Sequence, residues 1–270
     1  MTKVITTGNF KGGVGKTTNA VMISYELSNM GKKVLMVDFD PQANTTDLLF
    51  TTMKKVLKKD PVYEITLANA IFDHQDLRPA LINVKENLDL LPSYKDLQAY
   101  ERFLYDNFSD DYSMDNYFNK LLKEIKSDYD FVIIDVPPQM NKFTDSAFVA
   151  SDYVIIILQT QERSLKGAET YVDHLLQLTD DYDLATDVLG VLPVLMQNGS
   201  DLDKDVIDDA VDSFQKQNLF KNHIKQMARL KRFDREGITN NNSDVHDKNV
   251  HKVYINVVEE MLERIELLQK

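Results

Sequence analysis

Short apolar runs recur along the chain, and stretches with helical spacing separate them. Six of these runs have strand length and little alternation of apolar and polar positions, as expected for parallel strands covered on both faces. They are Val4–Thr7, Val34–Val37, Leu88–Leu91, Phe131–Ile134, Tyr153–Leu158 and Val188–Leu195. Strand and helix patterns that alternate in this way predict an α/β fold, doubly wound, with a mostly parallel sheet flanked by helices.

Two apolar stripes predict helices that dock on this sheet. Ala20, Ile23, Leu27 and Met30 form the first stripe, and Gly31 is placed to end that helix. The second stripe lies near the C-terminus and consists of Val250, Val253, Val257, Met261, Ile265 and Leu268. Because no repeat or Pro/Gly-rich linker interrupts the pattern, we expect a single domain over residues 1–270.

Composition narrows the class of protein. The chain has 270 residues, 43% of them apolar, which is enough for a substantial core. It has no cysteine, which excludes thiolate metal sites, cysteine nucleophiles and carriers of cysteine-ligated iron–sulfur clusters. The sequence shows neither an apolar signal region nor a run of about 18 apolar residues, so we expect a cytoplasmic protein.

Charge is unevenly distributed in a chain whose net charge is −12. Asp201–Asp212 holds six Asp and one Lys, whereas Lys216–Arg235 holds seven Lys or Arg and one acid. The basic segment is a candidate for phosphate contacts, and the alternative is a solvated helix face that pairs with the acidic segment. We interpret a smaller basic run, Lys54–Lys59, and the polar and aromatic stretch Asp106–Asn119 as surface elaborations.

A glycine-rich loop, Gly8–Thr18, follows the first strand and opens the first helix. It departs from the strict G-x-x-x-x-G-K-[ST] pattern because position 10 is Phe, so it is a deviant P-loop. Glycines let the backbone fold around phosphate oxygens, and the helix N-terminus presents a positive dipole end. We expect Lys16 to reach the β and γ phosphates and Thr17 to bind Mg²⁺. The predicted cofactor-binding residues are Lys11, Gly12, Gly13, Val14, Gly15, Lys16, Thr17 and Thr18.

Lys11 lies on the incoming limb of this loop, and its position allows two interpretations. It is either a finger that crosses a two-fold axis to the phosphates of a partner subunit, or a solvated surface lysine.

Acidic residues follow two of the predicted strands. Asp38 and Asp40 end the run Val34–Val37 and point to the same side if the strand continues through them. One would hold Mg²⁺ through water and the other would orient the attacking water, or both are ordinary loop carboxylates. Asp135 ends the run Phe131–Ile134 in the manner of a Walker B strand, whose Asp contacts Mg²⁺.

These motifs together resemble the ParA/MinD group of deviant Walker ATPases, and most closely the ParA-type plasmid and chromosome partition ATPases. Lys11–Thr18 resembles their signature Walker A, and Asp38–Asn44 resembles their D-x-D-P-Q-x-N segment. Asn87–Ser93, Tyr129–Pro138 and Ala150–Val154 continue the resemblance, which covers nearly the whole chain.

The resemblance implies a P-loop NTPase that hydrolyses ATP with Mg²⁺. Its ATP-bound sandwich homodimer would bind double-stranded DNA without sequence preference in a nucleoid-associated state. A centromere-binding, ParB-like partner would stimulate hydrolysis and release. By position the catalytic residues would be Asp40, which activates water, Lys16, and Lys11, which acts across the dimer. Thr17, Asp38 and Asp135 would hold the metal ion.

The sequence also departs from the family pattern. Phe10 stands where many relatives carry Gln, and the C-terminal basic region keeps little of the longer family pattern. The resemblance favours DNA contact for the basic segment over a solvated face, and Arg229, Lys231 and Arg232 are our first choices within it. Because the first predicted strand begins near Val4, we expect a small form without an N-terminal DNA-reading extension, similar to the Delta protein class.

Two alternatives use the same loop. A metabolic ligase or kinase would spend ATP on a small molecule and would not need DNA. A MinD-like membrane ATPase would need a basic amphipathic C-terminal helix. The helix here carries Glu259, Glu260, Glu263 and Glu266 outside its apolar stripe, which anionic lipid would repel, so we expect no membrane partner.

Overall fold

The structure, a computed structural model, describes residues 1–197, 200–241 and 243–269. These residues form one eight-stranded sheet with the order β3-β4-β2-β5-β1-β6-β7-β8. β3 (Ile82–Lys85) pairs antiparallel with β4 (Leu88–Leu91), and the other pairs in the described part of the sheet are parallel. The remaining strands are β1 (Lys3–Gly8), β2 (Val34–Asp38), β5 (Phe131–Asp135), β6 (Tyr153–Gln159), β7 (Asp187–Met196) and β8 (Ile224–Lys225).

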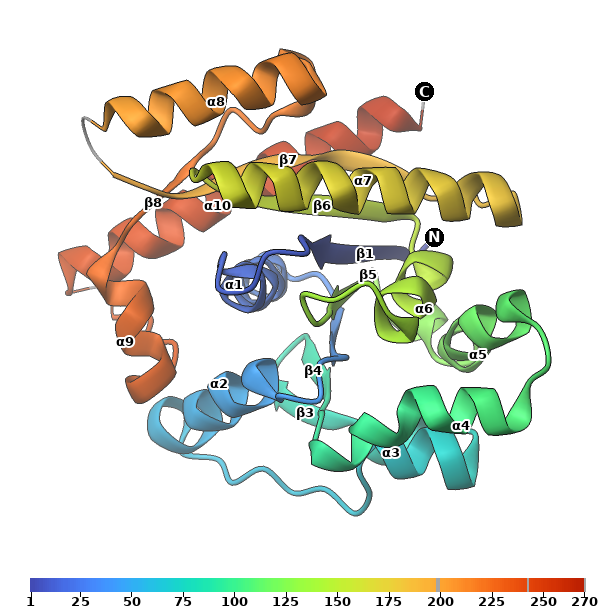
Figure 1. The fold of residues 1–270 in the computed structure, drawn as a ribbon. Helices are drawn as coiled ribbons and strands as arrows, with labels where there is room; N and C mark the ends of the chain where they lie inside the picture. The colour runs from blue at the N-terminus through green and yellow to red at the C-terminus, as the bar shows by residue number, and fades with distance from the viewer. Residues whose placement is uncertain (198–199, 242, 270) are drawn as a thin grey trace.

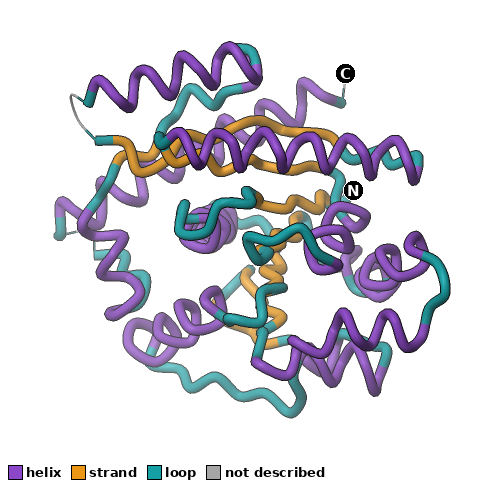
Figure 2. Tube along the Cα trace, viewed as in Figure 1, coloured by secondary structure: helices purple, strands orange, loops and turns teal. Residues whose placement is uncertain are grey.

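Helices cover both faces of the sheet, which confirms the doubly wound α/β fold (Figures 1 and 2). One face carries α1 (Lys16–Asn29), α2 (Asn44–Thr52), α9 (Ala228–Glu236) and α10 (Val245–Leu268). The other carries α3 (Leu67–Asn69), α4 (Tyr100–Asn107), α5 (Asp111–Lys123), α6 (Lys142–Ala150), α7 (Glu162–Tyr182) and α8 (Asp201–Phe214). Adjacent residues of β1, Val4 and Ile5, pack into cores on opposite faces.

All six predicted runs lie within strands of the sheet, namely β1, β2, β4, β5, β6 and β7. β3 and β8 escaped prediction because they are edge strands of only four and two residues. The two predicted helical stripes lie on α1 and α10, and Gly31 follows α1 with a left-handed φ of 80°.

The interpretation of Asp106–Asn119 as a surface elaboration is wrong. Most of its second half belongs to α5, which buries Met114 and Phe118 beneath the sheet. The Phe118 ring stacks on Phe39, with 4.4 Å between centroids. The apolar and aromatic residues of α5 recur at helical spacing and form part of the core, although polar residues separate them in the sequence.

The strand order brings the ends of β2, β5 and β1 side by side at the carboxyl edge of the sheet. The loops that leave these strands carry the P-loop and the acidic residues singled out in the sequence. Ligands of open α/β sheets bind at this edge. No helix in the described ranges is long and apolar enough to cross a membrane.

Candidate functional site

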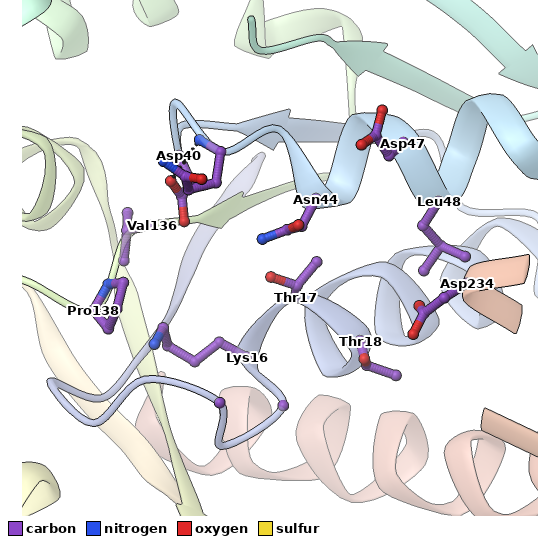
Figure 3. A pocket seen from close by; sticks show the side chains of 13 residues that line it. Lys16, Thr17, Thr18, Asp40, Asn44, Asp47, Leu48, Val136, Pro138 and Asp234 are labelled. Carbon is purple, nitrogen blue, oxygen red and sulfur yellow. Dashed lines mark hydrogen bonds between the residues drawn. The ribbon is translucent and has the colours of Figure 1, made fainter. Parts of the chain in front are cut away.

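A cavity of about 640 Å³ opens at this edge, between the P-loop, α2 and α9 (Figure 3). Lys16, Thr17 and Thr18 reach it from the start of α1, and Asp40 reaches it from the loop after β2. The other lining residues are Gly13, Gly15, Gln42, Asn44, Asp47, Leu48, Val136, Pro138 and Asp234. The cavity therefore combines three of the segments that sequence motifs had picked out.

The backbone of the P-loop is held in an open cradle. Gly13 and Gly15 have φ angles of 76° and 90°, in the left-handed region that side chains disfavour. Buried Asn9 anchors the incoming limb: its Nδ2 donates to the Ile157 carbonyl at 2.8 Å, and its Oδ1 accepts from the Lys11 N–H at 2.8 Å. Asn9 thus ties the cradle both to its own backbone and to β6.

Phe10 packs against α7, behind the P-loop. A Cβ at Gly8 would lie 1.9 Å from the Tyr171 ring, so that ring requires glycine there. Phe10 packs edge-on against the same ring at 4.8 Å and lies 5.8 Å from His174. The departure from the family pattern at position 10 therefore extends an aromatic contact between the P-loop and α7.

Lys16 projects into the cavity although its side chain is largely buried (Figure 3). Its Nζ donates to the Lys11 carbonyl at a long 3.4 Å. Burial lowers the pKa of Lys16, and nearby Asp135 and Asp40 partly offset that effect. A buried ammonium with one long hydrogen bond is a strong site for an anion such as a phosphate.

Asp135 is buried and, like Asp38, is not among the described residues that line the cavity, but one of its carboxylate oxygens is free to serve a metal ion. Its Oδ2 accepts from the Thr45 hydroxyl at 2.9 Å, whereas its buried Oδ1 has no hydrogen-bond partner in the described parts of the chain. Burial raises the pKa of Asp135 to about 6, although Thr17, Thr45 and Lys16 act to lower it. A free carboxylate oxygen beside the Thr17 hydroxyl fits the oxygen ligands that Mg²⁺ prefers.

A magnesium ion here would also need oxygens from a nucleotide. Within residues 1–197, 200–241 and 243–269, no group of three His, Cys, Asp or Glu side chains is arranged to hold a metal. Mg²⁺ sites of this class use one or two protein ligands and complete the shell with phosphates and water.

Asp40 and Asp38 diverge in the structure. Asp40 lines the cavity, its Oδ1 accepts from the Gln42 N–H at 2.9 Å, and burial raises its pKa. Asp38 is fully buried, and its Oδ2 accepts from the N–H and hydroxyl of Thr46 at 2.8 and 2.7 Å. β2 ends at Asp38, so the alternation that would have aligned the two carboxylates does not continue.

The structure therefore gives Asp38 an anchoring position beneath the start of α2 rather than a place in the cavity lining. Burial and neighbouring Asp135 raise the pKa of Asp38 well above its ordinary value. Its role toward Mg²⁺ remains a prediction.

The other P-loop residues divide between cavity and surface. Lys11 is half-buried and Gly12 is exposed, whereas Val14 is buried in the core. Within the described residues Lys11 forms no ion pair, so its ammonium is available to a second molecule.

Sequence reasoning missed several lining residues. Asp47 and Leu48 come from the first turns of α2, and Asp234 comes from α9, more than two hundred residues beyond the P-loop. Spacing along α2 relative to Asn44 gave a signal for the first two. No sequence signal placed Asp234 at the cavity, because only tertiary packing brings α9 to α2.

The three predicted DNA-binding residues lie on α9 but differ in environment. Arg229 donates from Nη2 to Thr239 at 2.9 Å and from Nε to buried Asp247, and its side chain is only 15% exposed. Lys231 and Arg232 are exposed. Arg229 is thus bound internally to α10 and the preceding loop, and only the other two are presented to a partner.

Comparison with known proteins agrees with this site. The AAA domain family AAA_31 matches residues 2–187. The chain is 32% identical over 230 residues to the sporulation initiation inhibitor protein Soj of Bacillus subtilis, covering 85% of this chain and 87% of Soj. It is 30% identical over 207 residues to the chromosome-partitioning ATPase Soj of Treponema pallidum, covering 77% of each. It is also 34% identical over 170 residues to a Methanocaldococcus jannaschii protein, MJECL24, covering 63% of this chain and 64% of that protein.

Solved structures share the fold. Apo McdA of Cyanthece superposes with a TM-score of 0.81 at 21% identity, covering 98% of this chain and all of that one. A plasmid partition protein of Borrelia burgdorferi bound to AMPPNP gives 0.74 at 24% identity, covering 97% and 99%. Cobyrinic acid a,c-diamide synthase of Mycobacterium smegmatis, with bound ADP and magnesium, gives 0.70 at 28% identity, covering 80% and 83%.

The match to residues 2–187 spans the P-loop, both acidic strand ends and the sheet that positions them. Together with the Soj relatives, it shows that this chain belongs to the AAA_31 family of AAA domains and, within it, to the ParA/Soj-type partition ATPases.

Proposed function

We propose that this chain is an ATP-driven switch for DNA partition, acting as one deviant Walker ATPase domain. ATP and Mg²⁺ bind in the cavity, and the ATP-bound chain forms a sandwich dimer that binds duplex DNA without sequence preference. A ParB-like partner stimulates hydrolysis, which releases the DNA. The observation that carries the proposal is buried Lys16, whose ammonium interacts with the nearby carboxylates of Asp135 and Asp40 and belongs to the glycine cradle.

The residues would divide the work of phosphoryl transfer as follows. Backbone N–H groups of the cradle and the Lys16 ammonium bind the β and γ phosphates. Thr17 and Asp135 would hold Mg²⁺, which would supply positive charge to offset that of the phosphates. Asp40 accepts a proton from the attacking water, and its burial-raised pKa makes it a better base near neutral pH. Asp38 fixes α2 through Thr46 and supports the metal site indirectly.

Lys11 distinguishes a dimeric switch from a simple ATPase. Lys11 is a half-buried residue on the incoming limb of the loop and makes no internal ion pair among the described residues. We place it against the phosphates of the partner subunit, where it would couple nucleotide binding to dimer formation. Lys11→Ala should then bind ATP but fail to dimerise, as measured by sedimentation.

One experiment tests the proposal as a whole. Binding to random-sequence duplex DNA is measured without nucleotide, with ADP and with a slowly hydrolysed ATP analogue, over a salt series. ATP-dependent binding that weakens steeply with salt is expected, because contacts to phosphates release counterions. Absence of binding in every nucleotide state would contradict the proposal and remove the basis for a nucleoid-associated protein.

The alternative is a ligase that spends ATP on a small molecule. Its specific support is the 28% identity to cobyrinic acid a,c-diamide synthase over 80% of this chain. A ligase would turn over ATP only with a metabolite and would ignore DNA. Turnover stimulated by DNA and a ParB-like protein, without any metabolite, favours the partition switch.

A further inference from the structure

Two basic segments that lie far apart in the sequence are neighbours in the fold. A π-helical turn, Met53–Leu57, continues α2, and it packs against the end of α9 (Figure 1). Lys55 Nζ donates to the Arg235 carbonyl at 2.5 Å, and the Ile238 N–H donates to the Thr52 hydroxyl at 3.0 Å. The run Lys54–Lys59 therefore adjoins the C-terminal end of the basic helix.

The cations of α9 point away from the core. Leu230 and Phe233 form its buried stripe. At 100° per residue, Lys231, Arg232 and Arg235 fall on the opposite side of the helix. All three are exposed. The outer surface of α9 is thus a row of cations that leads toward Lys55.

The lysines of the preceding run are exposed as well: Lys54, Lys55, Lys58 and Lys59. Neither they nor the three cations of α9 form an ion pair anywhere in the described ranges of the chain. Seven such cations on two adjoining elements stand out in a molecule of net charge −12. Self-repulsion of this kind is relieved by a polyanion.

We propose that these seven residues form one continuous surface for the phosphates of duplex DNA, here called the basic face. It consists of Lys54, Lys55, Lys58, Lys59, Lys231, Arg232 and Arg235. This rests on the proposed DNA-binding function and extends it from α9 to the end of α2. Arg229 is not part of the basic face, because Asp247 and Thr239 already engage it.

The chemistry of the basic face favours DNA over a membrane. A membrane-surface site inserts large apolar side chains among its cations. No residue of the basic face is apolar, and the exposed large apolar residues nearest to it in the described sequence, Val62, Tyr63 and Val245, lie outside its two segments. Contacts to phosphates need only cations in a row, without apolar anchors.

The same two helices meet the nucleotide cavity on their inner sides. Asp47 and Leu48 of α2 and Asp234 of α9 line that cavity (Figure 3). A nucleotide that repositions either helix would therefore move both halves of the basic face relative to each other. ATP binding could therefore change the DNA-binding surface directly, because the same two helices contact both.

The test replaces the lysines that sequence reasoning did not assign to DNA. Lys54→Gln, Lys55→Gln, Lys58→Gln and Lys59→Gln are combined, and binding to random duplex DNA is measured with the ATP analogue over a salt series. The control removes four exposed lysines elsewhere: Lys32→Gln, Lys33→Gln, Lys120→Gln and Lys123→Gln. We expect affinity to fall at least about tenfold for the first variant and the salt slope to shrink by about 0.9 per lost contact. The control and the ATP turnover without DNA should stay close to wild type.

The outcomes separate this inference from the proposed function. If wild type binds DNA and Lys231→Gln with Arg232→Gln weakens it, while the four-lysine variant binds normally, the inference is wrong and α9 acts alone. If wild type binds no DNA, the proposed function is wrong, and the inference that rests on it is wrong as well. Binding of wild type to vesicles of anionic lipid is measured as well. If the four-lysine variant loses that binding and still binds DNA normally, the inference is overturned in favour of a membrane site.

Folding is monitored by thermal melting, because Lys55 and Lys59 make hydrogen bonds to other segments. Should the four-lysine variant not fold, two further variants decide. Lys54→Glu reverses the charge of an exposed side chain and should weaken binding. Replacement of all four lysines by arginine keeps the charge and should retain binding.

Discussion

The nucleotide cavity and the basic face are neighbours that are built in opposite ways. The cavity joins the P-loop to the ends of β2 and β5, and buried hydrogen bonds of Asn9, Thr45 and Thr46 hold these segments in place. The basic face joins two segments almost two hundred residues apart, and its side chains are solvated. Buried, connected groups act as a unit, whereas solvated charges contribute separately and weakly. Single substitutions should therefore be severe in the cavity and mild on the basic face.

The largest effect is expected at Asp40. Asp40→Asn keeps the size of the side chain but removes the base, so turnover should fall about 1000-fold while ATP affinity is retained. Phosphate release and nucleotide binding are measured side by side, with Asp180→Asn on exposed α7 surface as control. Turnover that survives the change would remove Asp40 from the catalytic role.

Lys16→Ala should come next. The change removes the ammonium that we propose to face the phosphates, and we expect ATP affinity to fall at least about 100-fold. Titration calorimetry measures the loss, and Lys32→Ala, at the opposite edge of the sheet, should bind normally. Retained affinity in the Lys16 variant would show that the cradle binds phosphate through its backbone alone.

Arg229 sharpens the comparison because it lies on the basic helix but behaves as a buried group. Arg229→Ala leaves the carboxylate of Asp247, which is fully buried, without its partner. The free energy of unfolding should fall by about 2 kcal/mol, less than for a fully buried pair because Arg229 is partly solvated. Arg232→Ala should leave it nearly unchanged. Equal melting temperatures for the two variants would contradict the internal role of Arg229.

The last expected effect is a pH dependence, which builds up gradually with each pH unit. The pKa of Asp135 is raised from 3.8 to about 6, so the native state binds this proton more tightly than the unfolded chain does. Without nucleotide, the contribution of this group to stability therefore declines as pH rises from 3.8 to about 6. Protonated Asp135 is a poor ligand, so Mg²⁺-dependent ATP affinity should drop roughly tenfold for each pH unit below about 6.

Asp135→Asn separates the contribution of Asp135 from that of groups that titrate at a similar pH. One such group is Asp115, whose pKa burial also raises to about 6. The variant should lose the Mg²⁺-dependent change in affinity and show a flatter stability profile between those pH values. A wild-type profile in the variant would assign the pH dependence to another carboxyl group.

The sequence predicted local features of the molecule well and contacts between distant segments poorly. Six strands and the P-loop were predictable because each is a local pattern whose physics is contained within a few residues. The separation of Asp38 from Asp40 was not, since it depends on where β2 ends and on Thr46. Arg229 and Lys231 are indistinguishable as charges in a sequence, and only the tertiary position of Asp247 separates them. Asp234 and Lys54 required the packing of α9 on α2.

The contact between α2 and α9 has a thermodynamic consequence. Because both helices line the cavity on one side and carry the proposed basic face on the other, nucleotide and DNA would share one conformational equilibrium. Linkage between binding sites is reciprocal: the factor by which ATP raises affinity for DNA is the factor by which DNA raises affinity for ATP. A chain seated on DNA would then hold its ATP longer than a free one, and DNA itself would set how long each molecule stays in the bound state.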